Sequence, residues 1–109
     1  MNLQERIDLL SRLGEYMLSE TGSWQEAKEK AARQNNWFIP EFVALATRNI
    51  AQSFLKKEDL INWTNHYKLK NLNAEPEVVG IVMAGNIPLV GFHDLLCVFI
   101  TGHIAHVKA

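Results

Sequence analysis

The chain has 109 residues, of which 48% are hydrophobic and 21% are charged, a composition that suits one globular domain. Eleven basic and 12 acidic residues give a net charge of −1, so the charge balance does not indicate a nucleic-acid partner. Cys97 is the only cysteine, which excludes an intramolecular disulfide and favours a reducing, cytoplasmic compartment. The most apolar stretch, residues 87–100, is too short to span a membrane.

The first two-thirds of the sequence is expected to be helical. Apolar residues recur three and four positions apart from Leu3 to Met17, which predicts a first helix. Asn2 and Glu5 form a capping-box pattern at its start, and Gly22 is expected to stop it.

Three further helices are predicted before residue 68. Ser23 and Glu26 repeat the capping-box spacing and open a second helix, which fades at Asn35. A third helix begins near Pro40, and a fourth runs through residues 59–63. The apolar stripe expected on the third helix is Phe42, Val43, Ala46, Ile50, Ala51 and Phe54. The aromatic residues expected to bury the helical layer are Trp24, Trp37, Phe38, Phe42 and Trp63.

A linker over residues 68–76 divides the sequence. The segment has little periodicity and ends in Pro76. We therefore predict an N-terminal helical region, residues 1–75, and the start of an α/β domain, residues 76–109.

The second region predicts a strand, a helix and a strand, which is one βαβ unit. Residues 78–83 are a continuous apolar run of β-branched character, typical of a parallel strand covered on both faces. Pro88 is expected to open an apolar helix that Gly102 stops, and residues 104–108 predict the second strand. Two strands and one helix cannot cover such a strand on both faces. The sequence is therefore expected to be the N-terminal part of a larger α/β protein.

The turn after the first strand is the candidate site, because ligands of open parallel sheets bind beyond the carboxyl ends of the strands. Gly85 alone does not make a dinucleotide fingerprint, and the turn lacks the Gly-Lys-Ser/Thr ending of a phosphate loop. The side-chain amide of Asn86, at a helix N-terminus, can donate a hydrogen bond to a developing oxyanion. Asn86 can equally serve only to shape the turn.

The run from Val79 to Asp94, VGIVMAGNIPLVGFHD, resembles the bacterial acyl-CoA reductases. These are relatives of the fatty-acid reductase of bioluminescent bacteria, in the aldehyde dehydrogenase superfamily. Residues 36–40 and 102–108 are similar to the same family, so the resemblance covers nearly the whole chain. It implies an N-terminal helical region and then the first βαβ unit of a Rossmann-like, aldehyde-dehydrogenase-type nucleotide-binding domain.

The resemblance implies an oxidoreductase that reduces an acyl-CoA thioester to an aldehyde with NADPH or NADH. The catalytic cysteine of the family would lie beyond Ala109, so this chain alone is expected to be inactive. Asn86 matches the asparagine that holds the thioester oxygen. Lys108 matches the lysine that contacts the adenosine ribose of the cofactor, although a strand-end lysine is also an ordinary solvated charge. His106 departs from the pattern, because an apolar strand residue is expected there.

Two other functions remain open. An aldehyde dehydrogenase that oxidises aldehydes shares both the asparagine and the lysine. The other alternative is a non-enzymatic helical interaction module with a small α/β appendage. It requires that other residues of this chain, or a partner, cover and pair the strands. The sequence leaves the oligomeric state open, a homo-oligomer included, and predicts neither a membrane nor a nucleic-acid partner.

Cys97 is expected to be a small hydrophobic residue in the interior of an apolar helix. Asp94 places negative charge near it, which disfavours the thiolate and hence a nucleophilic role. His93 and Cys97, four residues apart, supply only two ligands, so no metal site is predicted.

Overall fold

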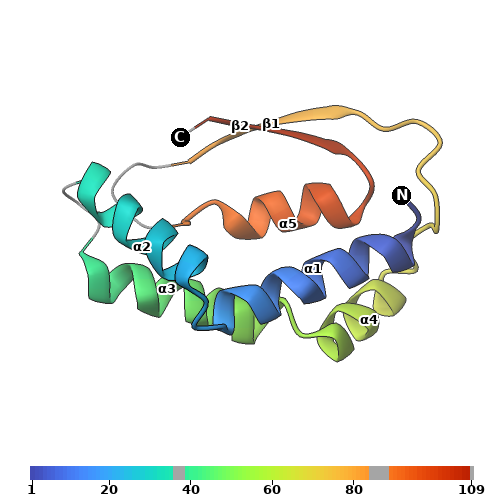
Figure 1. Ribbon diagram of the computed structural model, residues 1–109. Coiled ribbons are helices and arrows are strands. Elements are labelled where there is room, and N and C mark those ends of the chain that lie inside the picture. The colour runs from blue at the N-terminus through green and yellow to red at the C-terminus, as the bar shows by residue number, and fades with distance from the viewer. Residues whose placement is uncertain (36–38, 84–88, 109) are drawn as a thin grey trace.

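The computed structural model describes residues 1–35, 39–83 and 89–108. In chain order the elements are α1 (Leu3–Leu18), α2 (Gly22–Gln34), α3 (Pro40–Phe54), α4 (Lys57–His66), β1 (Val78–Val82), α5 (Phe92–Ile100) and β2 (Ile104–Lys108). Figure 1 shows the sheet on one side, α5 beneath it, α1, α3 and α4 beyond α5, and α2 at one end. The predicted mixture of helices with a parallel strand pair is confirmed, and the fold is broadly α/β.

The capping box predicted at the start of α1 is confirmed. The side-chain oxygen of Asn2 accepts the Glu5 amide hydrogen at 2.8 Å, and the Glu5 carboxylate accepts the Asn2 amide hydrogen at 3.1 Å. The predicted stop at Gly22 is wrong, because α1 ends before Ser19 and Gly22 is already the first residue of α2. The amide and hydroxyl groups of Ser19 both donate to the Tyr16 carbonyl, at 3.1 and 2.6 Å, and end the helix there.

The capping box predicted for α2 is also wrong. The helix begins at Gly22, one residue before Ser23, and no side chain among the described residues caps it. The Ser23 hydroxyl instead lies 3.1 Å from the Tyr16 hydroxyl of α1. The predicted end at Asn35 is confirmed.

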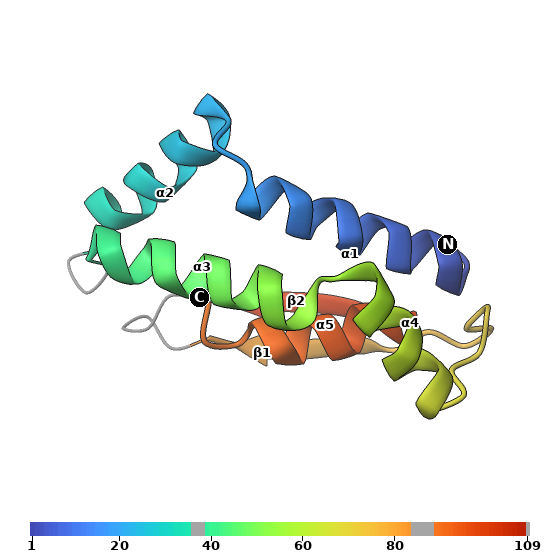
Figure 2. The same ribbon diagram turned by 90° about the horizontal axis from the view of Figure 1, so that it is seen from below.

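One apolar core joins the helices. Its buried members are Ile7, Leu10, Met17, Ile50, Ala51, Leu55, Leu60, Phe92, Leu96 and Ile100. They come from α1, α3, α4 and α5 and from the loop after α3, so the core includes residues on both sides of the linker. Figure 2 shows α3 between α1 and α5. Gly14 lets α1 approach closely, since a Cβ there would lie 2.7 Å from the Leu55 Cβ.

The apolar stripe of α3 is only partly the predicted one. Val43, Ile50 and Ala51 are buried as expected, but Thr47 shares the buried face and Phe42 is 56% exposed. The buried face of α3 therefore includes Thr47 and excludes Phe42, so it differs from the predicted apolar stripe. Two of those aromatic residues, Trp37 and Phe38, lie outside the described residues, while Trp24 and Trp63 are half-buried against the core.

The apolar helix begins later than predicted and ends as predicted. Pro88 lies outside the described residues, and α5 begins at Phe92. Leu89 has a φ of 55°, a left-handed conformation that cannot belong to an α-helix. At the other end Gly102 has a φ of 82°, and a Cβ there would lie 2.8 Å from the Asn73 Cβ. Glycine adopts this positive φ without strain and has no Cβ to collide with Asn73, so it suits the end of α5.

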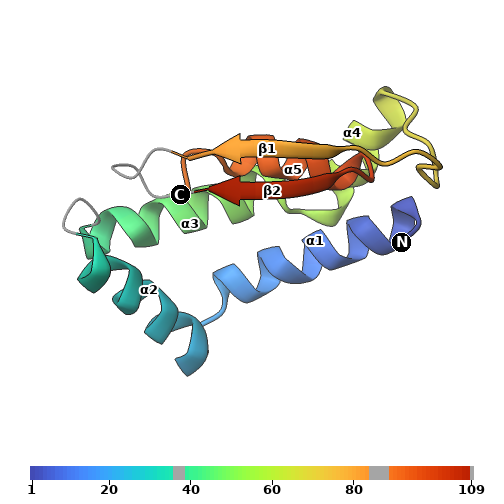
Figure 3. The ribbon, with the colours of Figure 1, turned by 90° about the horizontal axis from the view of Figure 1, so that it is seen from above.

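β1 and β2 pair in parallel, from Val78 opposite Ile104 to Val82 opposite Lys108. This confirms both predicted strands and their relative direction. α5 covers the inner face, where Ile81 is buried. On the outer face Val82 is 82% exposed, and Figure 3 shows the sheet in front of α5. The described residues thus leave the outer face uncovered, as expected for two strands and one helix.

We expect the outer face of the sheet to cause self-association of the 109-residue chain. Three exposed aliphatic side chains, Val78, Val82 and Ile104, lie there, and the outer edges of both strands have no strand partner among the described residues. Val82→Lys places a charge on this face, so it should shift the sedimentation profile toward monomer. Leu72→Lys, at an exposed linker position, should leave the profile unchanged. A compact wild-type monomer that unfolds cooperatively would contradict this expectation.

Candidate functional site

The candidate site lies at the carboxyl edge of the sheet. Val82 is the register partner of Lys108, and the Met83 amide donates to the Lys108 carbonyl at 2.8 Å. The two strands therefore end level with each other, and ligands of open parallel sheets bind beyond such carboxyl ends. This edge lies at the end of the molecule that holds the start of α3 (Figure 1).

Asn86 lies outside the described residues, within the segment 84–88 that joins β1 to the start of the α5 region. Its assignment to an oxyanion therefore stays a prediction. The described residues on either side of the segment pack against each other, because a Cβ on Gly91 would lie 2.7 Å from the Met83 Cγ. Glycine at this position allows the chain before α5 to pass against the end of β1. The Leu89 carbonyl then accepts the Phe92 amide hydrogen at 3.0 Å, just before the helix.

Lys108 lies where the strand pattern predicts, at the carboxyl end of β2. Its side chain is exposed, and within residues 1–35, 39–83 and 89–108 its ammonium group has neither a hydrogen bond nor an ion pair. His106, two residues earlier, is also exposed. The outer face of the sheet is open to solvent, which explains why a polar residue is tolerated where an apolar one was expected.

Cys97 lies half-buried in α5, with its Sγ 3.8 Å from His93 Nδ1. Burial, and then the charge of Asp94, raises the pKa of the Cys97 thiol. The His93 ring packs edge-on against Phe54, with 5.2 Å between ring centroids. A thiol in this environment carries little thiolate near neutral pH and is a poor nucleophile. Among the described residues, no three His, Cys, Asp or Glu side chains gather as metal ligands.

Sequence reasoning missed the buried guanidinium of Arg6, which is 3% exposed. Its Nε donates to the Ile100 carbonyl at 3.1 Å, Nη1 to the Met1 carbonyl at 2.7 Å and Nη2 to the Lys70 carbonyl at 3.4 Å. Burial lowers the pKa of Arg6, but a guanidinium stays charged at physiological pH. The signal in the sequence is an arginine within the apolar stripe of the first helix.

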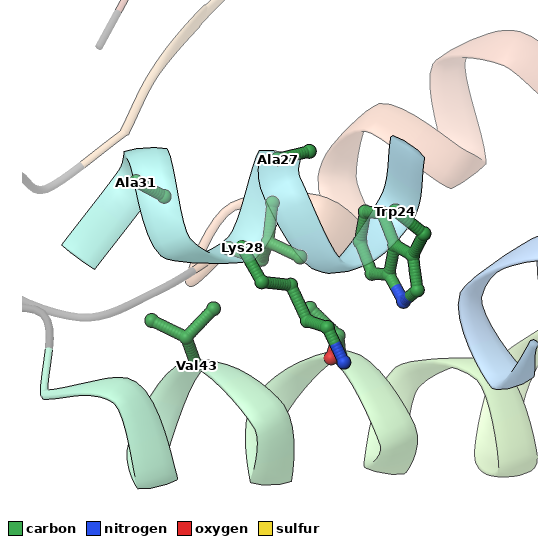
Figure 4. Close-up of a pocket in the computed structure, with 7 residues that line it drawn as sticks. Trp24, Ala27, Lys28, Ala31 and Val43 are labelled. Atoms are coloured by element: carbon green, nitrogen blue, oxygen red, sulfur yellow. The ribbon is translucent and has the colours of Figure 1, made fainter. Parts of the chain in front are cut away.

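Sequence reasoning also missed a cavity of about 180 Å³ between α2 and α3. The lining residues are Trp24, Ala27, Lys28 and Ala31 of α2, Val43 and Thr47 of α3, and Leu89. In Figure 4 the Lys28 side chain extends from α2 toward α3, with Trp24 on one side and Val43 on the other. The cavity depends on the spacing of the two helices, which periodicity within each helix does not specify.

The described residues form a broadly α/β fold with one parallel βαβ unit. Comparison with protein-family models, with curated proteins and with solved structures finds no match for this chain. Within the described ranges, no helix is both long and apolar enough to cross a bilayer.

Proposed function

We propose that this chain is the N-terminal part of an acyl-CoA reductase that uses NADPH or NADH to convert an acyl-CoA thioester to an aldehyde. The observation that supports the proposal best is the level carboxyl edge of β1 and β2. Lys108 lies at the end of one strand, and the segment that contains Asn86 begins at the end of the other. These are the two residues that the resemblance assigns to cofactor and to substrate.

A nicotinamide cofactor suits the donors at this edge. The Lys108 ammonium group is exposed and has no partner among the described residues, so it can donate to ribose hydroxyls. A bound nicotinamide cofactor would supply the hydride that releases the acyl group as an aldehyde. Lys108 would hold the adenosine half of that cofactor.

Asn86 would act on the substrate. A cysteine outside this sequence would attack the thioester carbonyl, and the new C–S bond would displace electrons onto the oxygen. The Asn86 amide would donate to that oxyanion, which collapses and expels the thiolate of coenzyme A. In this proposal Cys97 has no chemical role, because burial and Asp94 raise its pKa.

A non-enzymatic interaction module is the second candidate. The exposed outer face of the sheet, where Val78 is 59% and Val82 is 82% exposed, favours it. Such a module would bind its partner through this face and would need neither Asn86 nor Lys108.

The coding sequence and an activity assay test the proposal together. We expect the reading frame in genomic DNA to continue past Ala109 and to encode a cysteine. We also expect the encoded protein to oxidise one NADPH or NADH for each coenzyme A released from acyl-CoA. A stop codon directly after Ala109 would overturn the proposal. A protein that oxidises aldehydes and does not reduce acyl-CoA would instead be an aldehyde dehydrogenase.

A further inference from the structure

The cavity between α2 and α3 has the size of a small ligand site. Its volume of about 180 Å³ is similar to that of apolar protein cavities that take up benzene, roughly 150 Å³. Small side chains on α2, Ala27 and Ala31, leave this space opposite α3. Val43 and Leu89 supply further apolar wall, so the cavity suits a hydrocarbon body of about six carbon atoms.

Two of the three side-chain polar groups in the lining already have hydrogen bonds. The Trp24 indole N–H donates to the Met17 carbonyl at 2.9 Å. The Thr47 hydroxyl donates to the Ala44 carbonyl at 3.1 Å. A ligand therefore meets the Lys28 ammonium group as the polar donor that is still available.

Lys28 has no carboxylate partner among the residues that the structure describes. The described part of the chain contains no ion pair to Lys28, and its neighbours three and four positions away on α2 carry no acid. Its Nζ lies 5.5 Å from the centroid of the Trp24 ring, a cation–π contact that leaves the N–H donors of the ammonium group free. The lining thus combines apolar walls with one unneutralised positive charge.

We propose that this cavity binds a small organic anion, a carboxylate with an apolar body of about six carbon atoms. The apolar body fills the space beside Val43, Ala31 and Leu89, and the carboxylate pairs with Lys28. The inference uses no residue of the proposed reductase site. Its failure and the failure of that proposal are therefore separate results.

Isothermal titration calorimetry on the 109-residue chain tests the proposal with three six-carbon probes: sodium hexanoate, 1-hexanol and hexylammonium chloride. We expect one hexanoate site per chain, with hexanoate bound about five- to tenfold more tightly than hexanol, because a charge-assisted hydrogen bond is added. Hexylammonium should bind most weakly, because its charge repels that of Lys28. Equal affinities for hexanoate and hexanol would overturn the assignment of Lys28.

Two variants and one control variant separate the effect of the Lys28 charge from that of the cavity volume. Lys28→Met should lower the affinity for hexanoate to that for hexanol, since it removes the charge and keeps the apolar stem. Lys30→Met, on the same helix but outside the lining, changes the net charge equally and should leave binding as it is in the wild type. Ala31→Leu fills the cavity and should abolish binding of both probes. Unchanged hexanoate binding in the Ala31 variant would overturn the proposal.

The indole N–H signals in a ¹H–¹⁵N spectrum locate the site without any substitution. The Trp24 signal should shift during the hexanoate titration, because its ring lines the cavity. The Trp63 signal should stay in place, because this residue lies on α4 and outside the lining. A shift of the Trp63 signal alone would place the anion elsewhere and would contradict the proposal.

Discussion

Asn86→Ala in the complete reductase is expected to slow acyl transfer from acyl-CoA by roughly 10²–10³-fold, with cofactor affinity nearly unchanged. The amide would donate to the oxyanion only as charge develops on the thioester oxygen, so its removal raises the barrier and leaves ground-state binding intact. Release of coenzyme A in a single turnover measures the acylation step directly. If the variant acylates at the wild-type rate, Asn86 only shapes the turn.

Lys108→Ala is the complementary change, and we expect it to weaken cofactor binding about tenfold, with a smaller effect on acylation. Lys108 would hold the adenosine half of the cofactor, far from the reacting carbonyl. Fluorescence titration of NADPH and of NADH on both variants measures this affinity. Lys30→Ala removes a lysine from an exposed position on α2 and should behave as the wild type. An equal loss of affinity in this control would show that Lys108 acts only through net charge.

Local signals predicted the parts of the fold that depend on a few neighbouring residues. The box between Asn2 and Glu5 needs only the first turn of α1, and it forms as the spacing predicts. The proline at the start of α3 and the left-handed Gly102 after α5 are local in the same sense. The apolar run 78–83 predicted the first strand, and the helical pattern between it and the predicted strand 104–108 predicted the parallel pairing.

Residues whose backbone conformation is not specified by their sequence neighbours were predicted less well. Gly22 does not have the positive φ of a helix-stopping glycine, and it begins α2. Leu89 belongs by hydrophobicity to the helical pattern, yet it adopts a left-handed conformation where Gly91 packs against Met83. That contact is tertiary, and periodicity does not contain it.

The same distinction applies to the candidate site. The strand pattern was sufficient to place Lys108 at the carboxyl edge of the sheet. The position of Asn86 stays a prediction, because this residue lies outside the described residues. The cavity beside Lys28 depends on how far α2 stands from α3, which follows from packing between helices. The exposed outer face of the sheet agrees with the sequence-based expectation that two strands and one helix cannot cover both faces.

Arg6→Met is expected to lower the free energy of unfolding by about 2–4 kcal/mol, a large effect for one substitution. The methionine keeps much of the apolar stem but leaves three carbonyls, those of Met1, Lys70 and Ile100, without their donor. The Ile100 carbonyl belongs to the last turn of α5, whose carbonyls lack partners within the helix. Urea denaturation followed by circular dichroism measures the change.

Arg6→Lys and Arg12→Met show whether the hydrogen bonds or the charge explain the loss. A lysine keeps the charge but not the planar arrangement of donors, so Arg6→Lys should be destabilised to an intermediate extent. Arg12 is exposed on α1, so Arg12→Met removes the same charge and should change stability by no more than about 0.5 kcal/mol. If both methionine variants were equally stable, the three bonds would contribute nothing measurable. A large difference would mean that one buried guanidinium ties α1 and the linker to the end of α5, the helix on which the sheet packs.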